Sequence, residues 1–337
     1  MKIIDLEAHF HTNKYIEYLR GRKTVPREEY GSSINRVWYT DDIWVERNVR
    51  VEEKLLDLGE NRIREMDEAG IDMQMISLSG PHIQLFEPEE GTYLSKIIND
   101  EISVVINKFP ARFIGLAAIA PQSPEAAAFE LERAVTKLGF KGLLLQSHAR
   151  DEYLDAKKYW IIFETAEKLD VPIYLHPTIP SKSIRTAFAD YGWDFMTTPF
   201  GYAVEASLHA VRLIHSGLFD KYPRLKIILG HLGEGLPYWL NRLDYRWLKT
   251  SAYKKTKISK KPSYYVKSNF YITTSGMSFL PAFMCAYLAL SANNIAFASD
   301  YPYEICKEAV HFLKDSPICD GDKEKIAHVT AEKLFKL

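Results

Sequence analysis

The sequence predicts an α/β protein built as a (β/α)8 barrel. Short apolar segments, typical of buried strands, alternate with longer amphipathic segments typical of helices. Apolar strands that alternate with helices indicate a parallel sheet covered by helices. About eight such strands within roughly 300 residues suit a closed barrel. A doubly wound open sheet is the alternative, but no glycine-rich phosphate-binding turn follows any strand.

The expected elements follow one another through the whole chain. The strands are apolar runs such as Ile3, Ile4 and Leu6, and the helices have apolar residues at a spacing of three and four. The expected strands are 2–8, 72–79, 112–120, 140–146, 171–176, 225–231, 270–275 and 294–300. The expected helices are 60–70, 94–110, 123–139, 159–170, 202–223 and 278–292.

We expect one domain over residues 1–337, because no linker, repeat or low-complexity tract divides the chain. Two segments interrupt the alternation, at about 13–55 and 177–202. Each follows a predicted strand, so both are expected as insertions at the C-terminal mouth of the barrel, where loops build active sites.

The composition excludes several classes of protein. A net charge of −1 argues against a general nucleic-acid binder. The three cysteines form no C-x-x-C pair, and no secretory leader precedes the first strand, so we expect a cytoplasmic protein. The longest apolar stretch, 276–294, contains Pro281 and falls short of the roughly 20 residues of a membrane span. We expect a buried helix there and no membrane association.

Polar residues stand at the C-terminal ends of four predicted strands. Glu7 and His9 end the first strand, His176 the fifth, His231 the sixth and Asp300 the eighth. In a strand, residues two apart point the same way, so Glu7 and His9 share one face. Imidazole and carboxylate without thiolate suit Zn²⁺, Mn²⁺ or Fe²⁺ at an open site rather than a closed structural zinc site. The sequence therefore predicts a metal site at the barrel mouth.

Four motifs make a family resemblance specific. They are "LEAHF", "VPIYLHP", "FDKYPRLKIILGHLGEGLPYWLNRLD" and "FASDYPYE", and they span Glu7 to Glu304. The chain resembles the amidohydrolase superfamily, in the branch related to aminocarboxymuconate semialdehyde decarboxylase. Within that branch it is most similar to the aromatic-acid decarboxylases typified by γ-resorcylate (2,6-dihydroxybenzoate) decarboxylase.

The resemblance implies a distorted (β/α)8 barrel with one divalent ion per subunit, Mn²⁺, Zn²⁺ or Mg²⁺. It also implies a homodimer or homotetramer in which Arg242 reaches the substrate in a neighbouring subunit's active site. His231 would be an acid/base residue with Glu234 beside it. The implied metal ligands are Glu7, His9, His176 and Asp300.

The chain departs from the H-x-H pattern that many superfamily members carry on the first strand. Glu7 replaces the first histidine, and a carboxylate favours a harder ion such as Mn²⁺ or Mg²⁺. Lys141 stands at the start of the fourth strand, not at its end, so a bridging carbamylated lysine and a binuclear hydrolase are not expected. We interpret His11 as a supporting or structural residue.

The resemblance implies reversible, non-oxidative decarboxylation of an ortho-hydroxybenzoate-type acid, which makes the chain a carbon–carbon lyase. Either Asp300 or His231 would donate the proton to the ring carbon. The nearest alternative is a mononuclear hydrolase that opens a lactone or amide on the same barrel. A third hypothesis is a metal-dependent binding protein without catalytic activity. The sequence does not specify which aromatic acid is the substrate.

Overall fold

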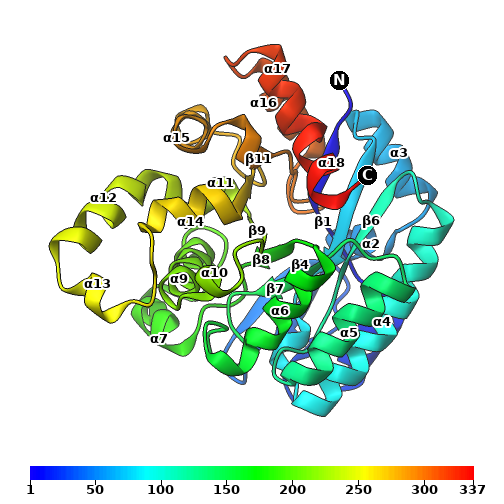
Figure 1. Ribbon diagram of the computed structural model, residues 1–337. Helices are drawn as coiled ribbons and strands as arrows, with labels where there is room; N and C mark the ends of the chain where they lie inside the picture. Colours follow the sequence, from blue (N-terminus) through cyan, green and yellow to red (C-terminus); the bar gives the residue numbers. More distant parts are fainter.

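The computed structural model describes residues 1–337, apart from the side chains of residues 193–194 and 252–253. Its centre is an eight-stranded parallel sheet whose strands follow one another in chain order (Figure 1). All eight strands expected from the sequence are present. They are β1 (Ile4–Phe10), β5 (Met73–Leu78), β6 (Phe113–Ala117), β7 (Gly142–Gln146), β8 (Ile173–His176), β9 (Ile227–Leu229), β10 (Phe270–Thr273) and β11 (Ile295–Ala296).

Backbone hydrogen bonds close the sheet into a barrel. The last strand is short, but the chain after it runs on beside β1. Leu6 N donates to Phe297 O at 3.0 Å, and Asp300 N donates to Glu7 O at 3.0 Å. His9 N then donates to Tyr301 O at 2.7 Å. This closure confirms the predicted barrel and places the ends of its first and last strands side by side.

Two apolar clusters hold the barrel together. The smaller one includes Leu6, Met75, Leu144 and Ile228, which come from four different strands and fill the barrel interior. The larger one joins the other faces of the strands to the surrounding helices. Polar side chains that point inward at the C-terminal ends of the strands therefore stand on a rigid apolar base.

The surrounding helices begin and end where the sequence supplies caps. Pro88, Pro124 and Pro262 stand in the first turn of their helices, where a missing N–H costs nothing. Gly70 ends another helix in the left-handed conformation. These helices are α3 (Glu60–Ala69), α4 (Pro88–Lys108), α5 (Pro124–Lys137), α6 (Trp160–Leu169), α9 (Gly201–His215), α10 (Leu218–Lys221), α12 (Leu236–Lys249), α13 (Ala252–Lys255), α14 (Pro262–Asn269), α16 (Cys306–Asp315), α17 (Asp320–Glu324) and α18 (Thr330–Phe335).

The segment 13–55 contains regular structure that the sequence did not reveal. An antiparallel sheet of β2 (Arg27–Glu29), β3 (Ile34–Trp38) and β4 (Trp44–Asn48) lies between α1 (Asn13–Gly21) and α2 (Val49–Leu56). Its strands are short, and their alternation is hard to distinguish from a polar loop.

The segment 177–202 carries α7 (Lys182–Arg185) and α8 (Trp193–Met196). Buried Met196 and Ile179 pack with Val37, Tyr39 and Ile43 of the first segment. The two segments therefore form one layer above the barrel.

The helix expected within 276–294 is present, but the expectation that it is buried holds for only one of its faces. α15 (Leu280–Leu290) buries Phe283, Ala286 and Leu290, whereas Leu288 is 78% exposed. The run is apolar on both faces, so its composition concealed which face meets solvent. None of the helices described by the structure combines the length and apolar character needed to cross a membrane.

Candidate metal centre and active site

Three of the predicted metal ligands converge at the mouth of the barrel. One nitrogen or oxygen atom from each of Glu7, His9 and His176 lies within 4.8 Å of the others. Nε2 of His176 is 3.3 Å, and Nε2 of His9 is 4.0 Å, from Oε1 of Glu7. Strands β1 and β8 bring these residues together from positions far apart in the chain.

The atoms at this point are prepared for a cation. Oε1 of Glu7 is buried without a hydrogen-bond partner among the described groups, which is costly unless something positive binds it. Nδ1 of His176 lies 2.6 Å from the carbonyl oxygen of Pro177, so that nitrogen carries the proton and Nε2 faces the centre with its lone pair. Nδ1 of His9 lies 3.2 Å from Oγ of Ser77. The donor set fits one divalent metal ion.

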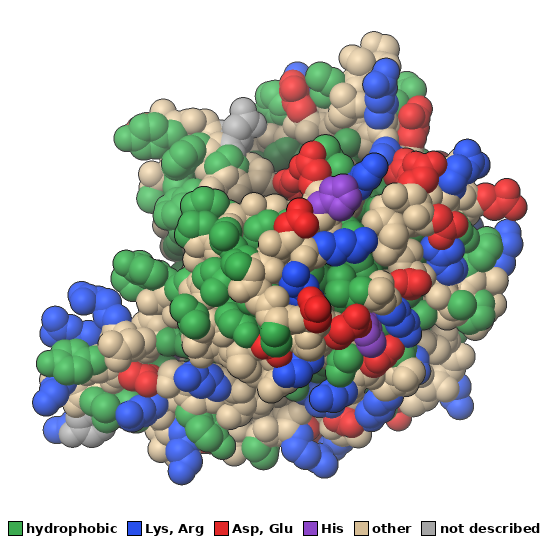
Figure 2. All heavy atoms as spheres, turned by 90° about the horizontal axis from the view of Figure 1, so that it is seen from above, with side chains coloured by type: hydrophobic (Ala, Val, Ile, Leu, Met, Phe, Trp, Pro, Cys, Tyr) green, Lys and Arg blue, Asp and Glu red, His purple; other side chains and the backbone are tan. Residues whose placement is uncertain are grey.

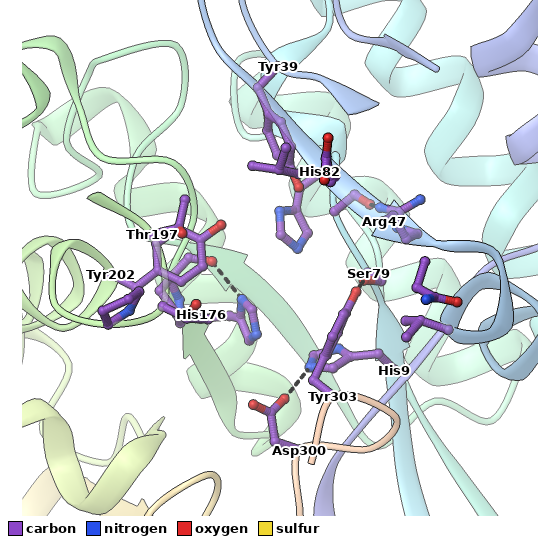
Figure 3. A pocket seen from close by; sticks show the side chains of 18 of the residues that line it. His9, Tyr39, Arg47, Ser79, His82, His176, Thr197, Tyr202, Asp300 and Tyr303 are labelled. Carbon is purple, nitrogen blue, oxygen red and sulfur yellow. Dashed lines mark hydrogen bonds and ion pairs between the residues drawn. The ribbon is translucent and has the colours of Figure 1, made fainter. Parts of the chain in front are cut away.

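Asp300, the fourth predicted ligand, lies directly beside this group. Its Oδ1 is 3.2 Å from Nε2 of His9 (Figure 3). Its Oδ2 is 3.8 Å from Nε2 of His231. Nδ1 of His231 in turn lies 2.7 Å from Oε1 of Glu234. The structure therefore links the predicted acid/base residues to the metal group through Asp300.

The backbone at these residues adopts an uncommon conformation. The φ values are 49° at His231, 52° at Glu234 and 69° at Asp300. Non-glycine residues with positive φ are infrequent, and they cluster at functional sites. All four residues of α11 (His231–Glu234) have positive φ values, and together they form a tight left-handed turn. This turn places both side chains on the mouth side of β9.

Charges at the site shift the pKa values in opposite directions. Burial would lower the pKa of His231, but the neighbouring carboxylates of Glu234 and Asp300 outweigh it and raise the pKa well above its ordinary value. Burial would raise the pKa of Asp300, yet the neighbouring imidazoles of His231 and His9 hold that pKa below its ordinary value. Burial would also raise the pKa of Glu7, but the neighbouring imidazoles of His176 and His231 outweigh it and hold that pKa below its ordinary value.

A cavity of about 440 Å³ opens onto the metal group. This volume lies within the usual range for small-molecule sites. The barrel contributes His9, His176, His231 and Asp300 to its lining, and the two mouth segments close it from the other side (Figure 3). The mouth segments contribute Tyr39, Arg47, Asn48, Thr197, Thr198 and Tyr202.

Sequence reasoning missed three further residues of this cavity, His82, Arg47 and Tyr303. Arg47 is buried, and it donates to Oε2 of Glu28 at 3.0 Å and to the carbonyl oxygen of Gly80. The hydroxyl of Tyr303 lies 2.5 Å from Oγ of Ser79. None of the three stands at a strand end with a recognisable ligand pattern, and only folding brings them to the cavity.

A buried carboxylate behind the site was also missed. Asp5 accepts hydrogen bonds from Glu7 N at 3.1 Å and from Ser299 N at 2.9 Å. It also accepts from Oγ of Ser299 at 2.6 Å and from Nε2 of Gln74 at 3.1 Å. Because Ser299 precedes Asp300, one carboxylate fixes the backbone beside Glu7 and beside Asp300. The sequence offered one signal for Asp5, because it lies two residues before Glu7 on β1 and residues two apart on a strand point the same way.

Arg242 and His11 lie away from this arrangement. Arg242 is exposed on α12 and does not line the cavity, and the structure gives it no ion pair among the described residues. Asp244, one of the partners that its sequence neighbourhood offers, accepts instead from Ser263. Nε2 of His11 lies 3.2 Å from the carbonyl oxygen of Gly80, in a structural contact.

Curated relatives share this sequence over most of its length. The Amidohydrolase family profile matches residues 4–337. The γ-resorcylate decarboxylase of Polaromonas sp. strain JS666 is 40% identical over 293 residues, 84% of this chain and 89% of the relative. The enzyme of the same name from Rhizobium sp. strain MTP-10005 is 35% identical over 305 residues, 88% of this chain and 91% of the relative.

Solved structures agree with these relatives. The 5-carboxyvanillate decarboxylase of Sphingomonas paucimobilis has a TM-score of 0.90 at 36% identity, covering 100% of this chain and 99% of that one. A dihydroxybenzoic acid decarboxylase from Polaromonas sp. JS666, solved with bound manganese and the inhibitor 2-nitroresorcinol, has a TM-score of 0.87 at 36% identity and covers 100% and 97%. The chain belongs to the amidohydrolase family.

Proposed function

We propose that this chain catalyses the reversible, metal-dependent, non-oxidative decarboxylation of an ortho-hydroxybenzoate-type acid. One observation carries the proposal. The Glu7–His9–His176 group and the Asp300–His231 pair face the same small cavity. Relatives of the same family that are named for γ-resorcylate and for 5-carboxyvanillate are similar to this chain along most of its length. The reaction makes the chain a carbon–carbon lyase that uses one divalent metal ion per subunit.

The chemistry explains why such a cavity is needed. Direct loss of CO2 from a benzoate would leave an electron pair in the plane of the ring, where the π system cannot delocalise it. An ortho hydroxyl allows another route, in which the carboxyl-bearing carbon first accepts a proton and the ring passes through a non-aromatic keto form. The carbon–carbon bond then breaks, its electron pair restores the aromatic ring, and CO2 leaves. Glu7, His9 and His176 would hold a divalent ion, which would supply positive charge beside the substrate's carboxylate.

The chain's own residues move the proton. His231 and Asp300 form the proton-transfer pair, because Nε2 of His231 faces Oδ2 of Asp300 at 3.8 Å. Glu234 holds the other ring nitrogen and orients the imidazole toward this pair. A proton passes between two groups directly or through one water, and catalytic contacts that are long in the free enzyme tighten when the substrate binds. Asp300 lies closer to the metal group than His231, so the pair can receive a proton on one side and deliver it on the other.

The proposal is tested by measuring the products. The purified protein, loaded in turn with Mn²⁺, Zn²⁺ and Mg²⁺, is incubated with salicylate, 2,6-dihydroxybenzoate and 5-carboxyvanillate while CO2 release is followed. The expected result is CO2 and the matching phenol from at least one acid, with loss of activity after chelation. Hydrolysis of aryl lactones or amides without CO2 release would instead identify a mononuclear hydrolase. Tight binding of the acids without turnover would identify a binding protein.

We further propose a homodimer, which can assemble into a homotetramer, with Arg242 serving the partner's active site. Tyr238, Trp239 and Tyr245 are 73%, 50% and 55% exposed on the same helix as Arg242. Large exposed apolar patches mark interaction sites. Figure 2 shows hydrophobic side chains gathered on the left-hand side of the molecule, the side on which Figure 1 places α12 and α15. Arginine gives a fixed fork of donors suited to an anionic substrate.

A further inference from the structure

His82 is a buried imidazole in the wall of the cavity. His82 is only 5% exposed, and its ring points into the space among His9, His176 and Tyr303 (Figure 3). Neither ring nitrogen has a hydrogen-bond partner within the part of the chain that the structure describes. A buried polar group without a partner is unusual and costly. We therefore expect a bound ligand, rather than another group of the protein, to form a hydrogen bond with this ring.

The backbone holds His82 in place. Its carbonyl oxygen accepts a hydrogen bond from Leu85 N at 3.1 Å, where the chain turns into η1 (Ile83–Leu85). Its ring centroid lies 5.5 Å from that of His176. An atom that contacts His82 therefore lies close to the metal group rather than at the far end of the cavity.

The charge around His82 favours a neutral partner. The nearby cation, Arg47, already donates to the carboxylate of Glu28 and to the carbonyl oxygen of Gly80. The charge of Arg47 is therefore already balanced by Glu28, and a carboxylate of the substrate is not required to pair with it. A hydroxyl group both donates and accepts a hydrogen bond, which matches the one donor and one acceptor of a neutral imidazole.

We propose that His82 is a specificity-determining residue that hydrogen-bonds a second ortho hydroxyl of the substrate. This inference rests on the proposed function for its substrate class. An ortho-hydroxybenzoate held through its carboxylate and the adjacent hydroxyl has one free ring position near the metal group. That position is the second ortho carbon, on the other side of the carboxylate. His82 thus selects 2,6-dihydroxybenzoate-like acids over salicylate-like acids.

Equilibrium binding of two inert analogues tests the proposal without turnover. 2-Nitroresorcinol and 2-nitrophenol differ by one ortho hydroxyl, and both are titrated calorimetrically into the manganese-loaded protein. The ratio of the two dissociation constants is compared between the wild type and His82→Phe, which keeps a ring but removes both nitrogens. Because each ligand is its own reference, intrinsic differences between the two phenols cancel. We expect the preference for 2-nitroresorcinol to fall about five- to tenfold in the variant, as for one lost hydrogen bond.

Two further variants and a control make the result specific. His82→Asn and His82→Gln place an amide near Nδ1 and near Nε2, and one of them should restore part of the preference. His209 is a second buried imidazole whose nitrogens have no partner among the described groups, but it does not line the cavity. His209→Phe should leave the ratio unchanged. Metal content and thermal midpoint are measured for every variant, so that a misfolded protein is recognised.

Several outcomes would overturn the inference. An unchanged ratio in His82→Phe, equal weakening of both ligands, or failure of 2-nitroresorcinol to bind would each do so. In the corresponding kinetic assay, an equal loss of kcat/KM for salicylate and 2,6-dihydroxybenzoate would show that His82 contacts a group common to both. If the binding ratio behaves as expected but no acid releases CO2, the proposed function fails while the hydroxyl site stands.

Discussion

Nδ1 of His231 lies 2.7 Å from Oε1 of Glu234, in a contact made within a single left-handed turn. The contact fixes the ring so that its other nitrogen faces Asp300. A buried carboxylate beside an imidazole also favours the protonated ring, which agrees with the raised pKa of His231. Glu234 therefore both orients His231 and keeps a proton available at the edge of the metal group.

This relationship predicts the behaviour of His231→Asn. The variant should bind wild-type amounts of metal, because His231 is not one of the three convergent ligands. Its kcat should fall by roughly a hundred- to ten-thousand-fold, the usual contribution of a positioned acid or base. Metal analysis and steady-state kinetics are the measurements. A near-normal rate with full metal content would make His231 a structural residue.

Removal of a ligand should act on the metal itself. His176→Ala takes away a nitrogen 3.3 Å from Oε1 of Glu7 and should lose stoichiometric metal after gel filtration. Tyr174→Phe is the matched comparison, because the Tyr174 hydroxyl donates to Oε2 of Glu7 without joining the metal group. That change should weaken metal binding by only roughly 10–100-fold. Retention of metal and activity by His176→Ala would disprove the ligand assignment.

Asp5 should affect the metal from behind the sheet. Asp5→Asn replaces one acceptor oxygen with a donor, so the donors of Glu7 N, Ser299 and Gln74 can no longer all be satisfied. We expect manganese affinity to fall roughly 10–100-fold, since partners of ligands tune a metal site on that scale. Manganese titration measures this, with the exposed Asp320→Asn as control. An unchanged affinity would limit Asp5 to a role in folding.

Arg242 should be needed in trans. Arg242→Ala should raise KM or lower kcat without changing metal content, because the side chain lies outside the cavity of its own subunit. When the Arg242→Ala and His231→Asn variants are mixed, some dimers contain one subunit of each kind. In such a dimer the Arg242→Ala subunit keeps its own His231 and receives Arg242 from the other subunit, so one of the two sites is complete. Such mixtures should regain activity that neither variant has alone. A fully active monomer in dilute solution, or no recovery on mixing, would contradict the proposal.

Acid should destabilise the protein partly through His209. Burial lowers the pKa of this imidazole to about 3, against 6.5 for its ordinary value. The unfolded chain therefore binds a proton that the folded chain refuses, and the stability present above pH 6.5 is lost as the pH falls toward 3. At pH 5 the loss is about 2 kcal/mol, from 1.36 kcal/mol per unit. Relative to the wild type, His209→Leu should gain this amount between pH 7 and pH 5 in urea unfolding; parallel curves would refute it.

The sequence by itself was enough to predict the barrel and the convergence of Glu7, His9 and His176 at its mouth. Buried strands appear in the sequence as short apolar runs whose side chains alternate between two faces. In a parallel sheet, the C-terminal ends of all these strands lie at one edge. Polar residues such as Glu7 and His176 that directly follow buried strands must then lie near one another. Local pattern and topology together therefore carried the prediction, without any knowledge of side-chain contacts.

Tertiary structure alone decided what surrounds the metal group. Arg47 lies in β4, a short strand whose pattern resembles a loop, and Tyr39 directly follows the short strand β3. His82 follows β5 with no ligand spacing to mark it. Their place in the cavity depends on how the two mouth segments pack, through contacts such as Met196 with Val37. Such contacts are long-range and weakly encoded in local sequence, whereas strand ends are set by local hydrophobicity. For the same reason only the fold showed which face of α15 is exposed.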